Sequence, residues 1–149
     1  MDTTRRVMTS GVREFVFAGN SFFTLQSMKT GNTLTYKVRH QPADKSRFGQ
    51  ECWFVRVRVR GKMEYLGYMK ADSQLRLTRR SIFKFNSTEA LAFDWFMRKI
   101  DRIPDSLVFW HEGSCGRCGR RLTDIQSVER GFGPECWKYV NLKPHERLE

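Results

Sequence analysis

Residues 111–137, HEGSCGRCGRRLTDIQSVERGFGPECW, hold the pattern that decides the fold of the second part of the chain. Cys115 and Cys118 lie in a glycine-rich segment, and Cys136 follows Pro134. Glycine permits the tight turn that brings two thiolates to about 2.3 Å from one metal ion. Proline favours the first position of a helix, so we expect Cys136 in a first helical turn, where the dipole favours a thiolate. The stretch predicts a zinc knuckle with a helix-borne ligand, as in a zinc ribbon or half treble clef.

A closed structural zinc site needs a fourth ligand beside the three cysteines. His111 is the predicted fourth ligand of this one zinc ion per chain, because the short spacer before Cys115 can wrap back to the metal. The alternatives are water at an open position or one of four other side chains, Cys52, Asp124, Glu135 and His145. A disulfide is a weaker explanation, because no signal peptide is expected and reduced cytosolic thiols at this spacing usually bind metal.

The segment CGRCGRRLTDIQSVERGFGPEC resembles a small zinc-binding module of phage, plasmid and other bacterial proteins, with the pattern CGxCGRxLTxxxSxxxGxGPxC. The stretches AGNSFFTLQSMKTGNTLTYKVR, WFVRV, YLG and WHEG resemble the same family in its two-part form. The resemblance covers the chain from about residue 18 to residue 137. It implies zinc and a mobile-element origin, but no activity, since the function of that family is unknown.

Composition is that of one or two small domains with a real core, since 40% of the 149 residues are hydrophobic and 13% aromatic. No apolar run reaches the roughly 18 residues of a membrane helix, and no signal segment is evident. We therefore expect no membrane association and a cytoplasmic location in a bacterial host cell. The net charge is +11, and residues 21–80 hold thirteen lysines and arginines against four acidic residues. Such a region attracts nucleic acid or acidic protein surfaces.

The fold class predicted is α+β, with an antiparallel meander of about five strands packed by one helix and followed by the zinc module. Two strands flank a turn at Gly31-Asn32 and share an apolar face that carries Phe23, Leu25, Ser27, Leu34, Tyr36 and Val38. A helix over residues 88–103 starts with a capping box at Asn86 and ends before Pro104. The predicted division is a basic β-rich domain over residues 1–104 and a zinc module over residues 105–149, packed together because no flexible linker separates them.

The clearest alternation is CWFVRVRVRGKMEYLGYMK, where valines and arginines point to opposite faces. A turn at Gly61-Lys62 would place Leu66 and Tyr68 with the valines, and Tyr65 and Met69 with the arginines. A further strand, QLRLTRR, would extend the basic face. The predicted nucleic-acid- or partner-binding residues are Arg56, Arg58, Arg60, Tyr65, Arg76, Arg79 and Arg80. Arginines on one face can follow a phosphate backbone, although an ordinary solvated face has the same pattern.

Three functions fit this sequence. The first is a zinc-containing mobile-element accessory protein that binds DNA or RNA through the basic face. The second is a protein-binding modulator or inhibitor of host defence or nucleic-acid-processing machinery, with zinc purely structural. The third is an enzyme with an open zinc position, which the motifs argue against: there is no zinc-deaminase pattern, phosphate-binding glycine loop or metalloprotease helix.

Overall fold

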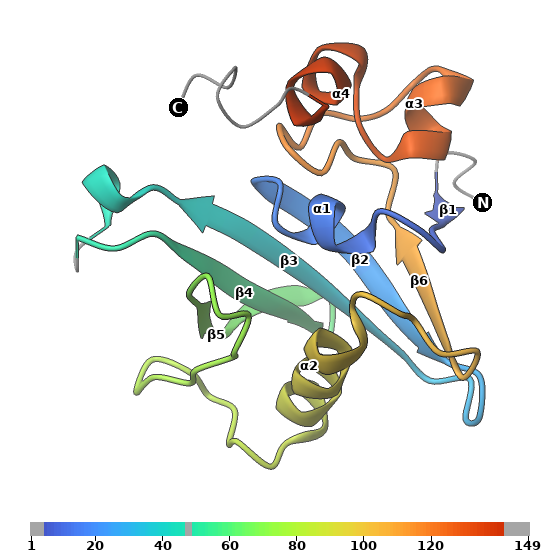
Figure 1. The fold of residues 1–149 in the computed structure, drawn as a ribbon. Coiled ribbons are helices and arrows are strands. Elements are labelled where there is room, and N and C mark those ends of the chain that lie inside the picture. The colour runs from blue at the N-terminus through green and yellow to red at the C-terminus, as the bar shows by residue number, and fades with distance from the viewer. Residues whose placement is uncertain (1–4, 47–48, 142–149) are drawn as a thin grey trace.

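The structure is a computed structural model that describes residues 5–46 and 49–141. In these residues six antiparallel strands form one sheet in the order β1-β6-β2-β3-β4-β5 (Figure 1). The strands are β1 (Arg6–Val7), β2 (Asn20–Ser27), β3 (Thr33–Gln41), β4 (Cys52–Val59), β5 (Lys62–Met69) and β6 (Leu107–His111). The helices are α1 (Val12–Val16), η1 (Ala43–Lys45), α2 (Thr88–Lys99), α3 (Ile125–Arg130) and α4 (Pro134–Val140). The predicted α+β class with an antiparallel sheet is confirmed.

The first hairpin has the predicted faces but a different pairing. Leu25 pairs with Leu34, and Phe23 pairs with Tyr36, so β2 and β3 are joined by residues 28–32 rather than by a two-residue turn. A Gly31-Asn32 turn would have paired Thr30 with Thr33. The observed pairing differs by an even number of residues, and side chains alternate with a period of two, so each residue keeps its face.

The second hairpin turns at Arg60-Gly61, one residue earlier than predicted, with φ of 52° and 80° at these two positions. A bulge follows between Val55 and Arg56, and it places Leu66 in the core without a partner on β4. The bulge reverses the faces beyond it. Met69 is consequently buried opposite Trp53, and Tyr68 lies opposite Phe54, which corrects the faces predicted for Met69 and Tyr68.

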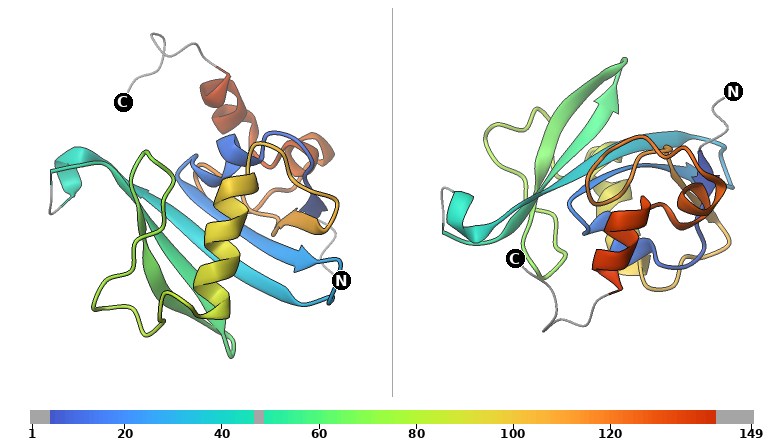
Figure 2. Two further views of the ribbon diagram at one scale, coloured as in Figure 1. Left: turned by 60° about the horizontal axis from the view of Figure 1, so that its bottom comes forward. Right: turned by 90° about the horizontal axis from the view of Figure 1, so that it is seen from above.

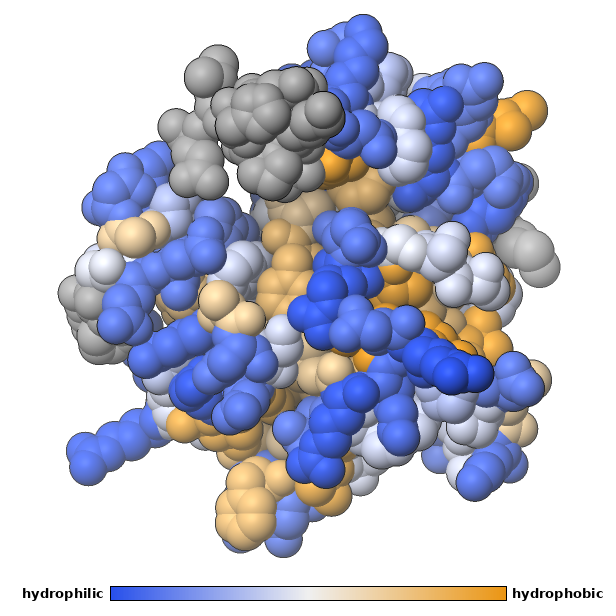
Figure 3. Space-filling model, viewed as in Figure 1, coloured by the Kyte–Doolittle hydropathy of each residue, from blue (hydrophilic) through white to orange (hydrophobic). Residues whose placement is uncertain are grey.

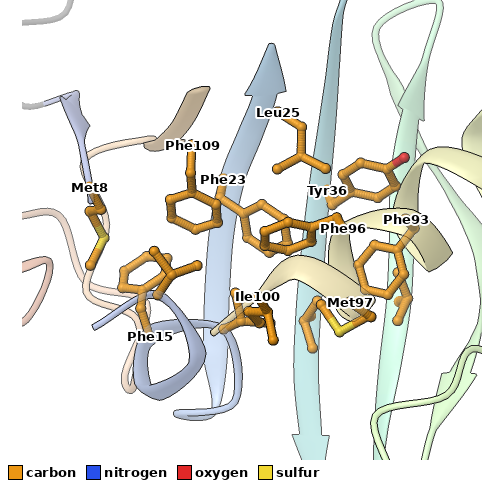
Figure 4. Packing of buried hydrophobic residues seen from close by; sticks show 14 of the residues in the cluster. Met8, Phe15, Phe23, Leu25, Tyr36, Phe93, Phe96, Met97, Ile100 and Phe109 are labelled. Atoms are coloured by element: carbon orange, nitrogen blue, oxygen red, sulfur yellow. The ribbon is translucent and has the colours of Figure 1, made fainter. Parts of the chain in front are cut away.

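The core lies between α2 and one face of the sheet (Figures 2 and 4). Phe93, Phe96 and Ile100 recur at helical spacing and are buried, as the sequence predicts. Phe23 from β2 stacks on Phe109 of β6, with ring centroids 4.9 Å apart. The helix begins at an N-cap serine, Ser87, whose side chain accepts the amide of Ala90, and it ends at Lys99; the capping box at Asn86 and the end at residue 103 are wrong.

The strand β6 runs between β1 and β2, so the segment 105–149 begins as an interior strand of the sheet. The chain then leaves the end of β6 and forms the cysteine-containing turn, α3 and α4, which lie together beyond that end of the sheet (Figure 1). Hydrophilic residues cover most of the side seen in Figure 3, with apolar areas between them. None of the helices in the described residues has the length and apolar character that a bilayer span needs.

Candidate functional site

Three thiols meet at one point beyond the sheet. The Sγ atoms of Cys115, Cys118 and Cys136 all lie within 4.8 Å of one another. The turn at the first two is closed by the amide of Gly119, which donates to the Cys115 carbonyl at 2.9 Å. Pro134 occupies the first turn of α4 and places Cys136 in that turn, as predicted. The three cysteines are therefore close enough to hold one metal ion.

Backbone amides and one guanidinium shape the charge of the cluster. Burial raises the pKa of the Cys115 thiol, but backbone N–H groups of Cys118, Gly133 and Arg117 donate to it, and the pKa is lowered overall. Burial raises the pKa of Cys136 to about 11, against the lowering effect of Arg117. Sulfurs this close cannot all ionise without a cation among them. The arrangement thus favours a bound cation.

The donor set is consistent with zinc. Two thiolates at about 2.3 Å from one tetrahedral zinc are about 3.8 Å apart, and the observed sulfurs need to move little to reach this separation. Soft thiolates select zinc, copper(I) or iron–sulfur clusters over magnesium and calcium. When bound, zinc would hold the turn and α4 together. The ligands from the chain would be Cys115, Cys118 and Cys136.

His111 does not belong to the cluster, in contrast to the sequence prediction. Its Nε2 donates to the carbonyl of Val128, and its Nδ1 accepts the amide of Gly113 at 3.0 Å. The side chain is fully buried, on the core side of β6 opposite Phe23. Burial lowers the pKa of His111, and the bond to Val128 partly offsets this. His111 is a neutral structural residue that ties β6 to α3.

The other predicted candidates for a fourth ligand are not in the cluster either. Asp124 is the N-cap of α3 and accepts the amide of Ser127 at 3.1 Å, and Glu135 pairs with Lys138. Cys52 is a buried free thiol at the start of β4. His145 lies outside the described residues. Within residues 5–46 and 49–141, only the three cysteines form such a group.

The cysteine turn packs closely on the first part of the chain. A Cβ on Gly116 would lie 2.6 Å from the ring of Phe15 in α1, and a Cβ on Gly19 would lie 2.7 Å from the carbonyl of Arg117. The amide of Asn20, at the start of β2, donates to the Gly116 carbonyl at 2.8 Å. The position of the turn is therefore fixed relative to β2.

The sheet face opposite α2 is basic and aromatic. A row of four paired residues crosses it, one from each of β2, β3, β4 and β5: Phe22, Lys37, Arg56 and Tyr65. The neighbouring row toward the cysteine turn is Asn20, Arg39, Phe54 and Tyr68. With about 4.8 Å between strands, each row spans about 14 Å. Cations and rings thus lie side by side over a surface wide enough for several groups of a polymer.

A groove of about 680 Å³ lies on this face. Its floor includes the first row and, from the second, Asn20, Arg39 and Phe54. Ser114, Cys118 and Gly119 of the cysteine turn line it on the β2 side. Arg80, from the segment after β5, lines it beyond Tyr65. In the view from above, the cysteine-containing segment lies over the β2 end while β3 and β4 extend beside it (Figure 2). The groove therefore joins the basic face to the candidate metal centre.

The predicted binding residues divide into two groups. Arg56, Tyr65 and Arg80 line the groove, and Arg58 is exposed on the same face with its guanidinium 5.4 Å from the Phe22 ring. Arg60 lies in the hairpin turn instead of the row, because Val59 pairs with Lys62, and it has the positive φ of a turn residue. The predicted strand QLRLTRR is only an isolated bridge at Arg76, whose guanidinium pairs with Asp72, and Arg79 is exposed beyond it.

Lys37, Arg39, Phe22 and Phe54 were not among the predicted binding residues, although they line the groove. The signal was present, since the alternation of β3 already placed Lys37 and Arg39 opposite its apolar face. The ring of Phe22 lies 4.9 Å from the Lys37 ammonium. The sequence could not predict that the cysteine turn lies next to this face, because that depends on the long-range packing of α1 and β2.

Residues 106–141 match the model of a family of unknown function, DUF6011. The matched segment includes β6, the three cysteines and both C-terminal helices. It agrees with the resemblance to a family of unknown function. Comparisons with curated proteins and with solved structures found no match.

Proposed function

We propose that this protein binds nucleic acid in the groove on the open sheet face and carries one zinc ion as a structural element beside it. The observation that carries the proposal is the crossing row of Phe22, Lys37, Arg56 and Tyr65, with Arg39 and Arg80 beside it. Fixed cations attract phosphates by counterion release, and flat rings among them offer faces to bases.

Zinc is supported by the three thiols and by the amides that donate to Cys115. Thiolate ligands and a turn of this type are typical of structural zinc sites, where the metal supplies folding energy. The mobile-element setting is supported by the resemblance of residues 115–136 to the phage and plasmid module. In this role the metal would hold the cysteine turn that lines the groove.

The direct test removes the groove charges. Lys37, Arg39 and Arg56 are changed together to glutamine, and affinity for a fluorescently labelled oligonucleotide is measured by anisotropy. These side chains are exposed, so the fold should persist. We expect affinity to fall by about tenfold or more at low salt.

The matched control also removes three positive charges, but from α2 and the turn after it. Arg98, Lys99 and Arg102 are exposed and are not among the groove residues. Their change to glutamine lowers the net charge equally, and should leave affinity nearly unchanged. Equal losses in both variants would mean that only net charge matters and would contradict a specific groove. No binding by the parent would leave an acidic protein surface as the partner to test.

A further inference from the structure

Resting on the proposed function, we propose that the groove is specific for single-stranded nucleic acid and stacks unpaired bases on Phe54 and Tyr65. The structure supplies three features for this: recessed rings, cations in the same rows as the rings, and a side of the groove formed by the cysteine turn.

The first feature is that the rings lie in the floor of a groove. Proteins that read duplex bases insert a protruding helix or strand pair into a duplex groove. Phe54 and Tyr65 are half-buried, between the cysteine turn at Gly119 and the segment at Arg80. In a duplex the base faces are stacked on one another inside the double helix, so they cannot contact rings in this floor. A single strand can lower its bases into the floor.

The second feature is the placement of rings and cations in the same rows. Arg56 pairs directly with Tyr65, and Arg39 pairs with Phe54. The Phe54 and Tyr65 rings are neighbours, with centroids 6.4 Å apart and planes inclined by 58°. Only a single strand offers a base face and a phosphate to adjacent side chains at the same depth. Successive bases stacked on aromatic rings in a basic groove are the usual mode of such binding.

The third feature is the side of the groove formed by the cysteine turn. Cys118 and Gly119 line the groove, and the turn is fixed to β2 through the bond from the Asn20 amide to the Gly116 carbonyl. On the other side, the Tyr65 hydroxyl lies 3.5 Å from the Thr78 hydroxyl, which also accepts the amide of Arg80. Both sides are thus tied to the sheet by hydrogen bonds, and the groove is formed before any ligand arrives.

The experiment compares labelled oligothymidylate, oligouridylate and a mixed-sequence DNA duplex, each of about 20 units, which exceeds the roughly 4–16 nucleotides that an OB-fold domain covers. Anisotropy titrations at one salt concentration give the three affinities for the zinc-loaded full chain. We expect at least one single strand to bind more tightly than the duplex. Comparison of oligothymidylate with oligouridylate shows whether DNA or RNA binds more tightly, and either preference supports the proposal.

Ring variants identify the stacking residues. Phe54→Leu keeps apolar packing but lacks a flat face, and Tyr65→Ala removes the second ring. Each should weaken single-strand binding by about 5-fold to about 150-fold and change duplex binding little. The matched control is Trp110→Leu, an aromatic residue opposite Thr24 on the same sheet face but not among the groove residues. It should bind like the parent, and circular dichroism checks the fold of all three.

The outcomes separate the two proposals. Duplex binding as tight as single-strand binding, or ring variants that bind single strands like the parent, would overturn the single-strand proposal. Loss of affinity in the Lys37, Arg39 and Arg56 variant would still support nucleic-acid binding in that case. Absence of binding to all three probes would overturn both.

Discussion

At the level of single residues, Arg117 lies between a thiol of the candidate metal centre and an aromatic ring. Its guanidinium donates to Cys136 Sγ at 3.5 Å and lies 3.7 Å from the centroid of the Tyr139 ring. Three thiolates around Zn²⁺ carry one net negative charge, which this guanidinium would offset. Its pKa is raised, although burial opposes the rise, because Cys136 accepts its hydrogen bond.

We predict that Arg117→Gln weakens zinc binding by about tenfold, within the 10–100-fold range typical for groups that contact metal ligands. Competition with a chromophoric chelator measures the affinity. Arg117→Lys keeps the charge without the planar group and should have a smaller effect. Unchanged affinity in Arg117→Gln would show that the guanidinium does not support the metal.

His111 gives a pH prediction. Burial is the main cause that lowers the pKa of His111 in the folded protein. Just below the ordinary histidine pKa of about 6.5, the unfolded chain therefore binds a proton at this residue while the folded chain does not. The free energy of unfolding should therefore fall as pH drops from about 7.5 through 6.5 toward the folded pKa. Protonation of the cysteines adds to this fall.

The contribution of His111 to this pH dependence is measured by comparison with the His111→Gln variant. The variant keeps the cysteines, so their protonation affects both proteins equally. Urea unfolding at about pH 7.5 and about pH 5.5 gives the change in free energy for each protein. The variant should be less stable at the higher pH, because two hydrogen bonds are altered, but should lose less on acidification. An equal loss in both proteins would rule out the neutral buried state of His111.

Among elements, the contact of the cysteine turn with α1 decides whether the two parts of the chain behave as one. Gly116→Ala would place a Cβ 2.6 Å from the Phe15 ring. Overpacking of this kind costs about 1–3 kcal/mol. We predict that Gly116→Ala lowers the free energy of unfolding by this amount, as measured by urea denaturation.

Gly133→Ala is the matched control, because a Cβ there meets no heavy atom within 4 Å and φ is −66°. It should change the free energy of unfolding by less than about 0.5 kcal/mol. If both variants are equally stable, the turn can move away from α1 and the contact is not restrictive.

The metal prediction also belongs to an element, the segment from the cysteine turn through α4. So short a segment buries little surface, so zinc should supply much of its folding energy. Purified protein should contain one zinc per chain by metal analysis, and Cys118→Ser should lose it and unfold this segment. Because Cys118 is exposed, its loss leaves no cavity that could explain the effect. Cys52→Ser should retain the metal, and zinc-free parent protein purified without chelators would contradict the assignment.

At the scale of the whole molecule, the sequence predicted what repeats locally. The alternation of Val55 and Arg56, the helical spacing of Phe93 and Phe96, and Pro134 before Cys136 each reflect a period or a preference of short range. The structure agrees with all three. For the same reason the apolar face of the first hairpin was correct although its pairing was not.

Features set by distant contacts could not be predicted. The bulge that buries Leu66 adjoins Gly67, where a Cβ would collide with the backbone carbonyl of Arg76. No sequence pattern near Gly67 predicts that contact. His111 looked like a ligand because of its spacing, and only its burial next to Val128 shows its structural role. The groove likewise depends on packing between segments far apart in the chain.

If fixed cations in the groove bind phosphates, as we propose, the salt dependence of affinity is the most direct test. For a single strand, the logarithm of the association constant should fall with the logarithm of salt concentration, with a slope of about −0.7 per phosphate neutralised. Changing Lys37, Arg39 and Arg56 to glutamine should make that slope shallower by about 2, whereas changing Arg98, Lys99 and Arg102 should leave it as in the parent. A parent slope near zero, or the same slope in the parent and the groove variant, would contradict the claim.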